Sequence, residues 1–339
     1  MPNWLSILRP SGGPFHRSRM LLGALVFGLT MGYQVFNQQH FAAGMMGFGI
    51  LATIMMDVGG NRRERLGSMV FGNILIITAA SISLTINHNL WFWFAGIIFL
   101  FSVIGASLSA GFALDLLLRM IASAYLIGYP GTFISHSMLA PFLAGAIITI
   151  AFALCVAPRV NNPISLSTPP HWHRDYKQLR QGQFAGATFG LLLAIACAFS
   201  FFFAQQLHFS APNVAAICTL MVFRPEPNRT STTIWQRLIG VLFASLLAWG
   251  CVFNLQSYGV LVGLAAISGA LVPVAFANGL MYVAAVTTFI VYLILALLGI
   301  HGHAAVLSAE HRIFETLLGA AIAFIFAKIF RSLKPATGP

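Results

Sequence analysis

Two oppositely charged residues stand four positions apart within an otherwise apolar stretch. Asp115 and Arg119 lie in residues 109–128. On a helix, residues four apart share one face and lie about 6 Å apart along the axis, so these two side chains can pair. Such a guanidinium can bind a carboxylate through two hydrogen bonds, while Asp115 releases Arg119 or carries a proton. The alternative is a neutralised structural pair, and the sequence leaves both interpretations open.

A second charged group lies near the end of the sequence. Arg312 and Glu315 are three positions apart, and Thr316 follows directly. Residues three apart share a helix face, so these side chains could form a second substrate-binding station. Equally, they could be an interfacial pair whose long side chains reach the lipid headgroups.

Two polar segments are rich in arginine. Residues 57–65 have the sequence DVGGNRRER, and residues 224–237 contain Arg224, Arg229 and Arg237. One interpretation is a cationic vestibule that gathers anions by electrostatic attraction, which makes these three arginines candidate substrate-binding residues. Anchoring at anionic headgroups on the cytoplasmic side explains the same residues without a binding role.

Acidic and histidine side chains supply candidates for proton coupling. They are Asp115, Glu315, His301, His303 and His311. Histidine titrates at about pH 6.5, so an acidic exterior would charge these three histidines, which we place at the outer side. The alternative is that imidazole simply suits a membrane interface. No spacing of histidine, cysteine or acidic residues is diagnostic of a metal site, and we predict none.

The composition excludes a water-soluble protein. Hydrophobic residues make up 58% of the 339 residues and charged residues only 7%, against about 25% charged in an ordinary globular domain. A chain this apolar is mostly membrane, which leaves no room for a large soluble catalytic domain. The net charge of +11 does not indicate a nucleic-acid partner, because the basic residues cluster between apolar segments. We therefore expect the lipid bilayer to be a partner.

Apolar runs separated by polar or Pro/Gly residues predict an all-α, polytopic membrane protein with twelve spanning helices. These helices are expected at residues 20–37, 40–56, 67–86, 90–107, 109–128, 138–157, 184–204, 210–223, 235–254, 258–275, 278–299 and 311–330. They form a first six-helix repeat (20–157) and a second (184–333), joined by a polar cytoplasmic linker (158–183) with one short amphipathic turn. Cytoplasmic tails precede and follow them at residues 1–19 and 334–339.

The basic residues give the orientation. Lys and Arg concentrate in cytoplasmic loops. With the N-terminus inside, all of the 18 basic residues fall on the cytoplasmic side except Arg119, within a span, and Arg312, at the outer end of the last one. We therefore predict a multi-pass protein of the inner (plasma) membrane with both termini cytoplasmic.

The two sets of six spans resemble each other in sequence. The residues QQHF at 38–41 correspond to QQLHF at 205–209, and Asn61-Arg62 corresponds to Asn228-Arg229, both at a separation of 167 positions. Because six is even, both halves enter the membrane from the same side, an arrangement found in transporters that place a path between two halves.

Two motifs resemble the fusaric acid resistance (FUSC) family. Residues 223–229 (FRPEPNR) and 235–240 (WQRLIG) are similar to its cytoplasmic loop and Arg-x-x-Gly helix start, and residues 312–319 (RIFETLLG) are similar to its closing Arg-x-x-Asp/Glu-Thr-x-x-Gly pattern. The resemblance implies an inner-membrane efflux protein of the aromatic acid exporter superfamily, to which plant aluminium-activated malate channels are related. Many bacterial members have a large soluble domain where this chain has only residues 158–183, so a partner efflux subunit would have to supply that domain unless this is a minimal form.

These features predict a transporter, not an enzyme, that exports a small organic anion, namely an aromatic or otherwise lipophilic carboxylate, with proton-coupled antiport as a further expectation. No Gly-x-x-x-x-Gly-Lys-Ser/Thr loop is present, so ATP use is not expected, and we predict no cofactor. The alternatives are a passive anion channel and a membrane subunit or scaffold of a larger assembly. A homodimer is compatible with the resemblance, although no span identifies an interface.

Overall fold

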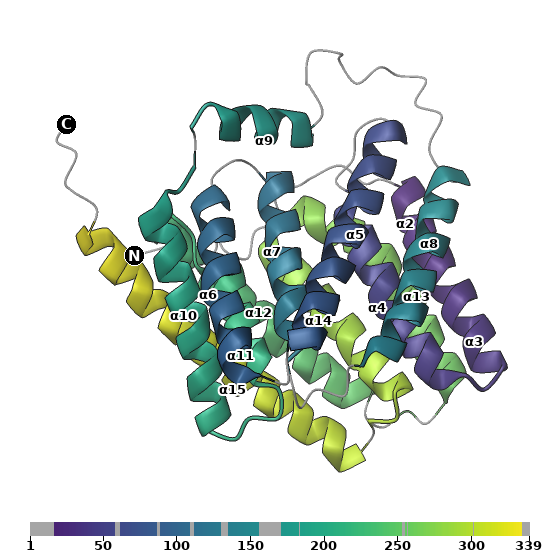
Figure 1. Cartoon of the computed structure of the whole chain (residues 1–339). Helices are drawn as coiled ribbons and strands as arrows, with labels where there is room; N and C mark the ends of the chain where they lie inside the picture. The colour runs from purple at the N-terminus through teal and green to yellow at the C-terminus, as the bar shows by residue number, and fades with distance from the viewer. Residues whose placement is uncertain are drawn as a thin grey trace. The chain divides into compact units, whose positions relative to one another are not determined.

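The computed structural model describes residues 17–57, 62–86, 89–108, 112–129, 135–155, 171–182, 184–252, 255, 257–300 and 302–333. All regular structure in these residues is helical (Figure 1). The helices, in chain order, are α2 (Arg17–Leu25), η1 (Val26–Met31), α3 (Gly32–Phe36), α4 (His40–Met56), α5 (Arg62–Ile86), α6 (Leu90–Ser107), α7 (Phe112–Ile127), η3 (His136–Met138), α8 (Leu139–Cys155), α9 (His171–Arg180), α10 (Ala187–Gln206), α11 (Pro212–Val222), α12 (Pro227–Cys251), α13 (Tyr258–Asn278), α14 (Leu280–Leu297) and α15 (Gly302–Leu333).

Every predicted spanning segment overlaps a helix, the first being the continuous run of α2, η1 and α3. Residues 109–111, 156–157 and 253–254 of the predicted spans lie outside the described residues. Nine helices within the described residues are long and apolar enough to cross a membrane, and α4 and α11 are shorter apolar helices. A helix satisfies its own backbone hydrogen bonds, which is the condition for crossing a bilayer. The chain is therefore a polytopic, helical membrane protein.

Local sequence explains several helix ends. The side chain of Asn89 caps α6 by accepting hydrogen bonds from the backbone N–H groups of Trp91 and Phe92. Pro212 occupies the start of α11, where no intrahelical N–H is needed. Gly279, with φ of 120°, separates α13 from α14 in a conformation that residues with a side chain rarely adopt.

The helices form two compact units. Unit 1 comprises Met1–Ile77, Ser135–Pro170 and Gln236–Ile313, and unit 2 comprises Thr78–Ile134, His171–Trp235 and Phe314–Pro339. The unit boundaries fall within α5, α12 and α15, so each of these helices has one end in each unit. Both units therefore contain helices from both predicted repeats.

Glycines allow close helix crossings in unit 1. In that unit, α4 packs on α8, and α13 packs on α2. A Cβ added at Gly49 of α4 would overlap the backbone oxygen of Phe142, and one at Gly145 of α8 would overlap that of Met46. The same is true where Gly23 of α2 faces the backbone of Gly269. Small residues at such crossings let membrane helices approach backbone to backbone.

Unit 2 has crossings of the same kind. There α10 packs on α6 and α11, and α7 packs on α6 and α11 (Figure 1). A Cβ added at Gly190 of α10 would overlap the backbone oxygen of Ser102 in α6, and one at Gly319 of α15 would overlap that of Ala215 in α11. The backbone separations at these crossings therefore require glycine.

The linker between the predicted repeats contains a longer helix than expected. We predicted one short amphipathic turn, whereas α9 has ten residues. It contacts α7 and runs crosswise to it in Figure 1. Tyr176, Lys177 and Arg180 are exposed on α9. A sequence of ten mostly polar residues gives no apolar run, which is why hydropathy alone missed this helix.

Candidate functional site

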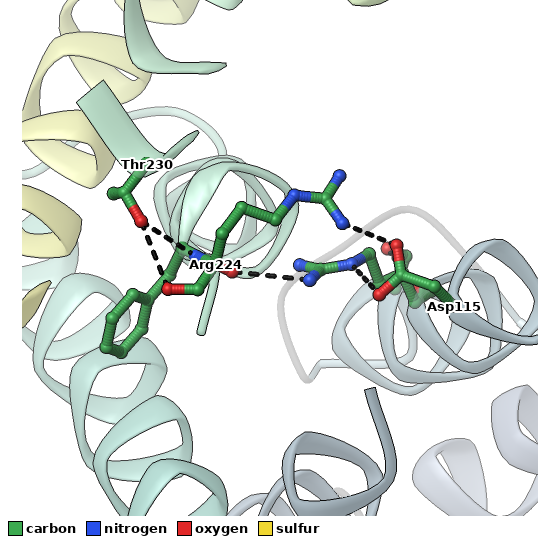
Figure 2. Close-up of polar contacts among 6 residues, drawn as sticks. Asp115, Arg224 and Thr230 are labelled. Carbon is green, nitrogen blue, oxygen red and sulfur yellow. Dashed lines mark hydrogen bonds and ion pairs between the residues drawn. The ribbon is translucent and has the colours of Figure 1, made fainter. Parts of the chain in front are cut away.

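Asp115 binds two arginines within unit 2. It lies in the first turn of α7, and Arg119 lies one turn further along, as the four-residue spacing predicts. Arg119 Nε donates to Asp115 Oδ1 at 3.0 Å. Arg224, in the loop between α11 and α12, donates from Nη1 to the other carboxylate oxygen, Oδ2, and Figure 2 shows its side chain reaching toward Asp115. The carboxylate is thus shared between a helix neighbour and a residue 109 positions away.

The guanidinium of Arg119 is buried and only partly satisfied. The residue is 1% exposed. Its Nη2 donates to the backbone oxygen of Phe223 at 3.3 Å, whereas its Nη1 has no hydrogen-bond partner among the described residues. Buried polar groups in proteins are usually paired, because an unmade hydrogen bond costs about 1–3 kcal/mol. Arg119 therefore holds an unused donor inside the helices.

The backbone of Arg224 is fixed by a buried threonine. The N–H of Arg224 donates to Thr230 Oγ1 at 3.0 Å, and the backbone oxygen of Arg224 is 3.1 Å from the same hydroxyl (Figure 2). Thr230 is fully buried in α12. This arrangement holds the loop so that the side chain of Arg224 meets Asp115.

The three side chains have a net positive charge. Two guanidiniums and one carboxylate sum to +1, and the side-chain exposures are 1% for Arg119, 10% for Asp115 and 24% for Arg224. Excess charge in such surroundings is poorly solvated and attracts a counter-ion. A carboxylate is a suitable counter-ion because guanidinium groups bind it through paired hydrogen bonds. We call Asp115, Arg119 and Arg224 the unit 2 cluster.

Unit 1 contains another carboxylate held by arginines, which we call the unit 1 cluster. Arg65 binds Asp57 with both arms, from Nε to Oδ1 at 2.8 Å and from Nη2 to Oδ2 at 2.7 Å, and Arg19 Nη2 lies 3.8 Å from Oδ1. The sequence predicts residues 57–65 as a basic segment and does not single out Asp57. The signal available was an acidic residue directly after an apolar span and beside arginines.

The other arginines predicted from the second basic segment do not join the unit 2 cluster. Arg229 is exposed on α12. Arg237 belongs to unit 1 and is half-buried, and its Nε is buried without a partner among the described residues. Of the three arginines predicted from residues 224–237, Arg224 alone forms an ion pair recorded in the described part of the chain.

Glu315 lies within α15 and is buried beside the start of α11. It is 1% exposed, and its Oε1 accepts a hydrogen bond from the backbone N–H of Ala211, directly before α11, at 2.9 Å. Thr316 is also buried, and its backbone oxygen accepts from the thiol of Cys218. Burial of Glu315 does not fit the interpretation in which this side chain reaches the headgroups. Arg312 is half-buried in unit 1.

Replacing Glu315 with alanine should destabilise the protein by about 2 kcal/mol, because the N–H of Ala211 at the start of α11 loses its acceptor. Glu315→Gln keeps an acceptor oxygen and should cost less than about 1 kcal/mol. Thermal unfolding midpoints in detergent measure both variants. Equal losses in the two would show that the bond to Ala211 contributes little. A stable Glu315→Gln that no longer responds to a proton gradient would identify Glu315 as a coupling residue.

The predicted outer histidines are not brought together in the described residues. His303 is exposed, His311 is half-buried, and His301 lies outside the described residues. No group of three or more histidine, cysteine, aspartate or glutamate side chains that could hold a metal occurs in the part of the chain that the structure describes.

Apolar helices of spanning length around a buried, positively charged ion cluster define a polytopic membrane protein with a charged site among its helices. Residues 195–326 match the family model described as fusaric acid resistance protein-like (FUSC_2), so this part of the chain is similar to a fusaric acid resistance protein-like domain. The match confirms the resemblance seen in the sequence and includes Arg224 and Glu315, whereas Asp115 and Arg119 precede it. No curated protein and no solved structure matches the chain.

Proposed function

We propose that this protein is an inner-membrane transporter, not an enzyme, that exports small aromatic or otherwise lipophilic carboxylates from the cytoplasm. The observation that carries the proposal is the buried guanidinium of Arg119, whose Nη1 has no partner among the described residues. It lies in a cluster of net positive charge that an incoming carboxylate would neutralise. The fusaric acid resistance protein-like match supports a role in transport.

Twelve spans with both termini in the cytoplasm form part of this proposal. Residues that the predicted topology places on one side meet within unit 2: Arg224 with Asp115 on the cytoplasmic side, and Ala211 with Glu315 on the outer side. A wrong number of spans between these positions would place such partners on opposite sides. Large apolar side chains such as Trp91 and Phe99 are exposed, as contact with lipid requires.

We also propose that the chain contains an internal repeat, in which its two six-helix halves are equivalent. Gly23 and Gly190 are 167 positions apart, the separation found in the sequence motifs, and both lie at a backbone crossing. Their partner helices, α13 and α6, are the fourth predicted span of the second and first halves, respectively. Likewise, α14 packs on α4 in unit 1, and α7 packs on α11 in unit 2. Each pair joins the fifth span of one half to the second span of the other.

Proton coupling is the finer part of the proposed mechanism. Asp115 is positioned to exchange partners, since protonation of its carboxyl would release Arg119 and Arg224 toward the substrate. Glu315 and the histidines predicted at the outer side are the further candidates for coupling.

Uptake into everted membrane vesicles tests the proposed function. Labelled aromatic and aliphatic carboxylates are supplied with and without an imposed proton gradient. Accumulation above equilibrium that collapses with the gradient is the expected result. Equilibration without accumulation would indicate a passive anion channel instead, and no flux of any anion would overturn the transport proposal.

A further inference from the structure

We propose that Asp115 sets the charge of the transported anion, so that the unit 2 cluster accepts anions with one negative charge in preference to those with two. The inference rests on the proposed function, because it concerns the same site. It adds a selection rule based on the number of charges in the cluster.

Asp115 compensates only part of the positive charge of the two arginines that it binds. Its carboxylate is bound by both guanidiniums, so one of the two positive charges is compensated inside the cluster. One positive charge remains for a ligand. A monocarboxylate brings the sum to zero, whereas a dicarboxylate leaves a net negative charge among buried groups. Uncompensated charge is costly in such a place because the protein replaces water poorly as a solvent for ions.

The hydrogen bonds of the cluster leave one donor for a ligand while Asp115 stays in place. Arg119 uses Nε for Asp115 and Nη2 for the Phe223 backbone oxygen, and its Nη1 is left without a partner among the described residues. Arg224 contacts Asp115 through Nη1 and is 24% exposed at its side chain. A ligand carboxylate at Arg119 Nη1 would therefore add to the ion pairs already present, and Asp115 would still count in the sum of charges.

The unit 1 cluster offers a matched comparison. Asp57 has a side-chain exposure of 4%, and both of its oxygens are bound by Arg65. Neither Arg19 nor Arg65 has a buried nitrogen without a partner in the described part of the chain. Asp57→Asn therefore removes the same charge as Asp115→Asn, but it alters no group that faces the proposed ligand.

Benzoate and phthalate are suitable probes, since they share one ring and carry one and two carboxylates. The full-length protein is reconstituted in liposomes, and concentration-dependent uptake of each labelled anion is measured near neutral pH after subtraction of empty liposomes. For the wild type, we expect half-saturation at a benzoate concentration at least about tenfold below that for phthalate. In Asp115→Asn, with a cluster charge of +2, this preference should fall by about tenfold or reverse. In Asp57→Asn and Asp115→Glu, it should persist.

The outcomes separate the selection rule from the function. Saturable uptake with the same benzoate-to-phthalate preference in wild type and Asp115→Asn overturns the rule and leaves the transport proposal intact. No saturable uptake of any carboxylate by the wild type overturns both. Should Asp115→Asn fail to fold, Arg224→Gln provides the second test at a partly exposed position. Its cluster is neutral, so half-saturation by benzoate should rise by about tenfold or more, and an unchanged value overturns the rule.

Discussion

Replacing Arg119 with glutamine is expected to reduce saturable carboxylate uptake by about thirtyfold or more. The substitution removes the buried Nη1 donor that has no partner among the described residues, and it leaves the cluster with one guanidinium and one carboxylate. Truncating one member of a buried, hydrogen-bonded charge pair typically costs about 2–5 kcal/mol in binding, and 1.4 kcal/mol corresponds to tenfold. Initial uptake rates in proteoliposomes, normalised to inserted protein, measure the effect.

Two further variants serve as controls for the effect of Arg119→Gln on uptake. Arg119→Lys keeps the charge but not the planar fork, so it should restore part of the affinity. Arg331→Gln removes a charge from an exposed position near the end of α15 and should leave uptake within about twofold of wild type. If Arg119→Gln inserts correctly and transports a carboxylate as well as the wild type, the pair with Asp115 is structural only.

Hydropathy located the helices because a membrane span is defined by its apolar length. The predicted segments 40–56 and 90–107 have the same bounds as α4 and α6, since polar residues flank α4 on both sides and Asn89 precedes α6. Three other helices begin five or more residues before the predicted segments. We expected 67–86, 235–254 and 311–330, whereas α5, α12 and α15 begin at Arg62, Pro227 and Gly302. A helix continues into water wherever its backbone bonds are satisfied, and hydropathy does not register those turns.

Part of the site can be predicted from local sequence, and part depends on long-range packing. The pair of Asp115 and Arg119 follows from spacing along one helix and is confirmed by a bond of 3.0 Å. The bond of Arg224 to Asp115 depends on packing of α7 beside α11, and no local pattern predicts a contact across 109 positions. The same holds for the Phe223 backbone oxygen, because any residue type supplies a carbonyl. The sequence therefore identified candidate charges, and the fold determined which of them meet.

Valine at Gly190 or at Gly23 should destabilise the protein by about 3 kcal/mol or more. At each position, a Cβ would overlap backbone atoms of the facing helix, those of Ser102 for Gly190 and those of Gly269 for Gly23. Overpacking costs about 1–3 kcal/mol where side chains can shift, and backbone atoms of two packed helices have less freedom to do so. We expect a large loss of monodisperse protein on heating in detergent for both variants.

Gly263→Val is the matched control for these two variants. Gly263 lies in α13, and nothing is within 4 Å of a Cβ added there. The control therefore carries the cost of a β-branched residue in a helix without the overlap. If the halves are equivalent, Gly23→Val and Gly190→Val should lose similar amounts of stability relative to Gly263→Val. If Gly23→Val is tolerated while Gly190→Val unfolds, the halves are not equivalent, because equivalent crossings must both require a residue without a side chain.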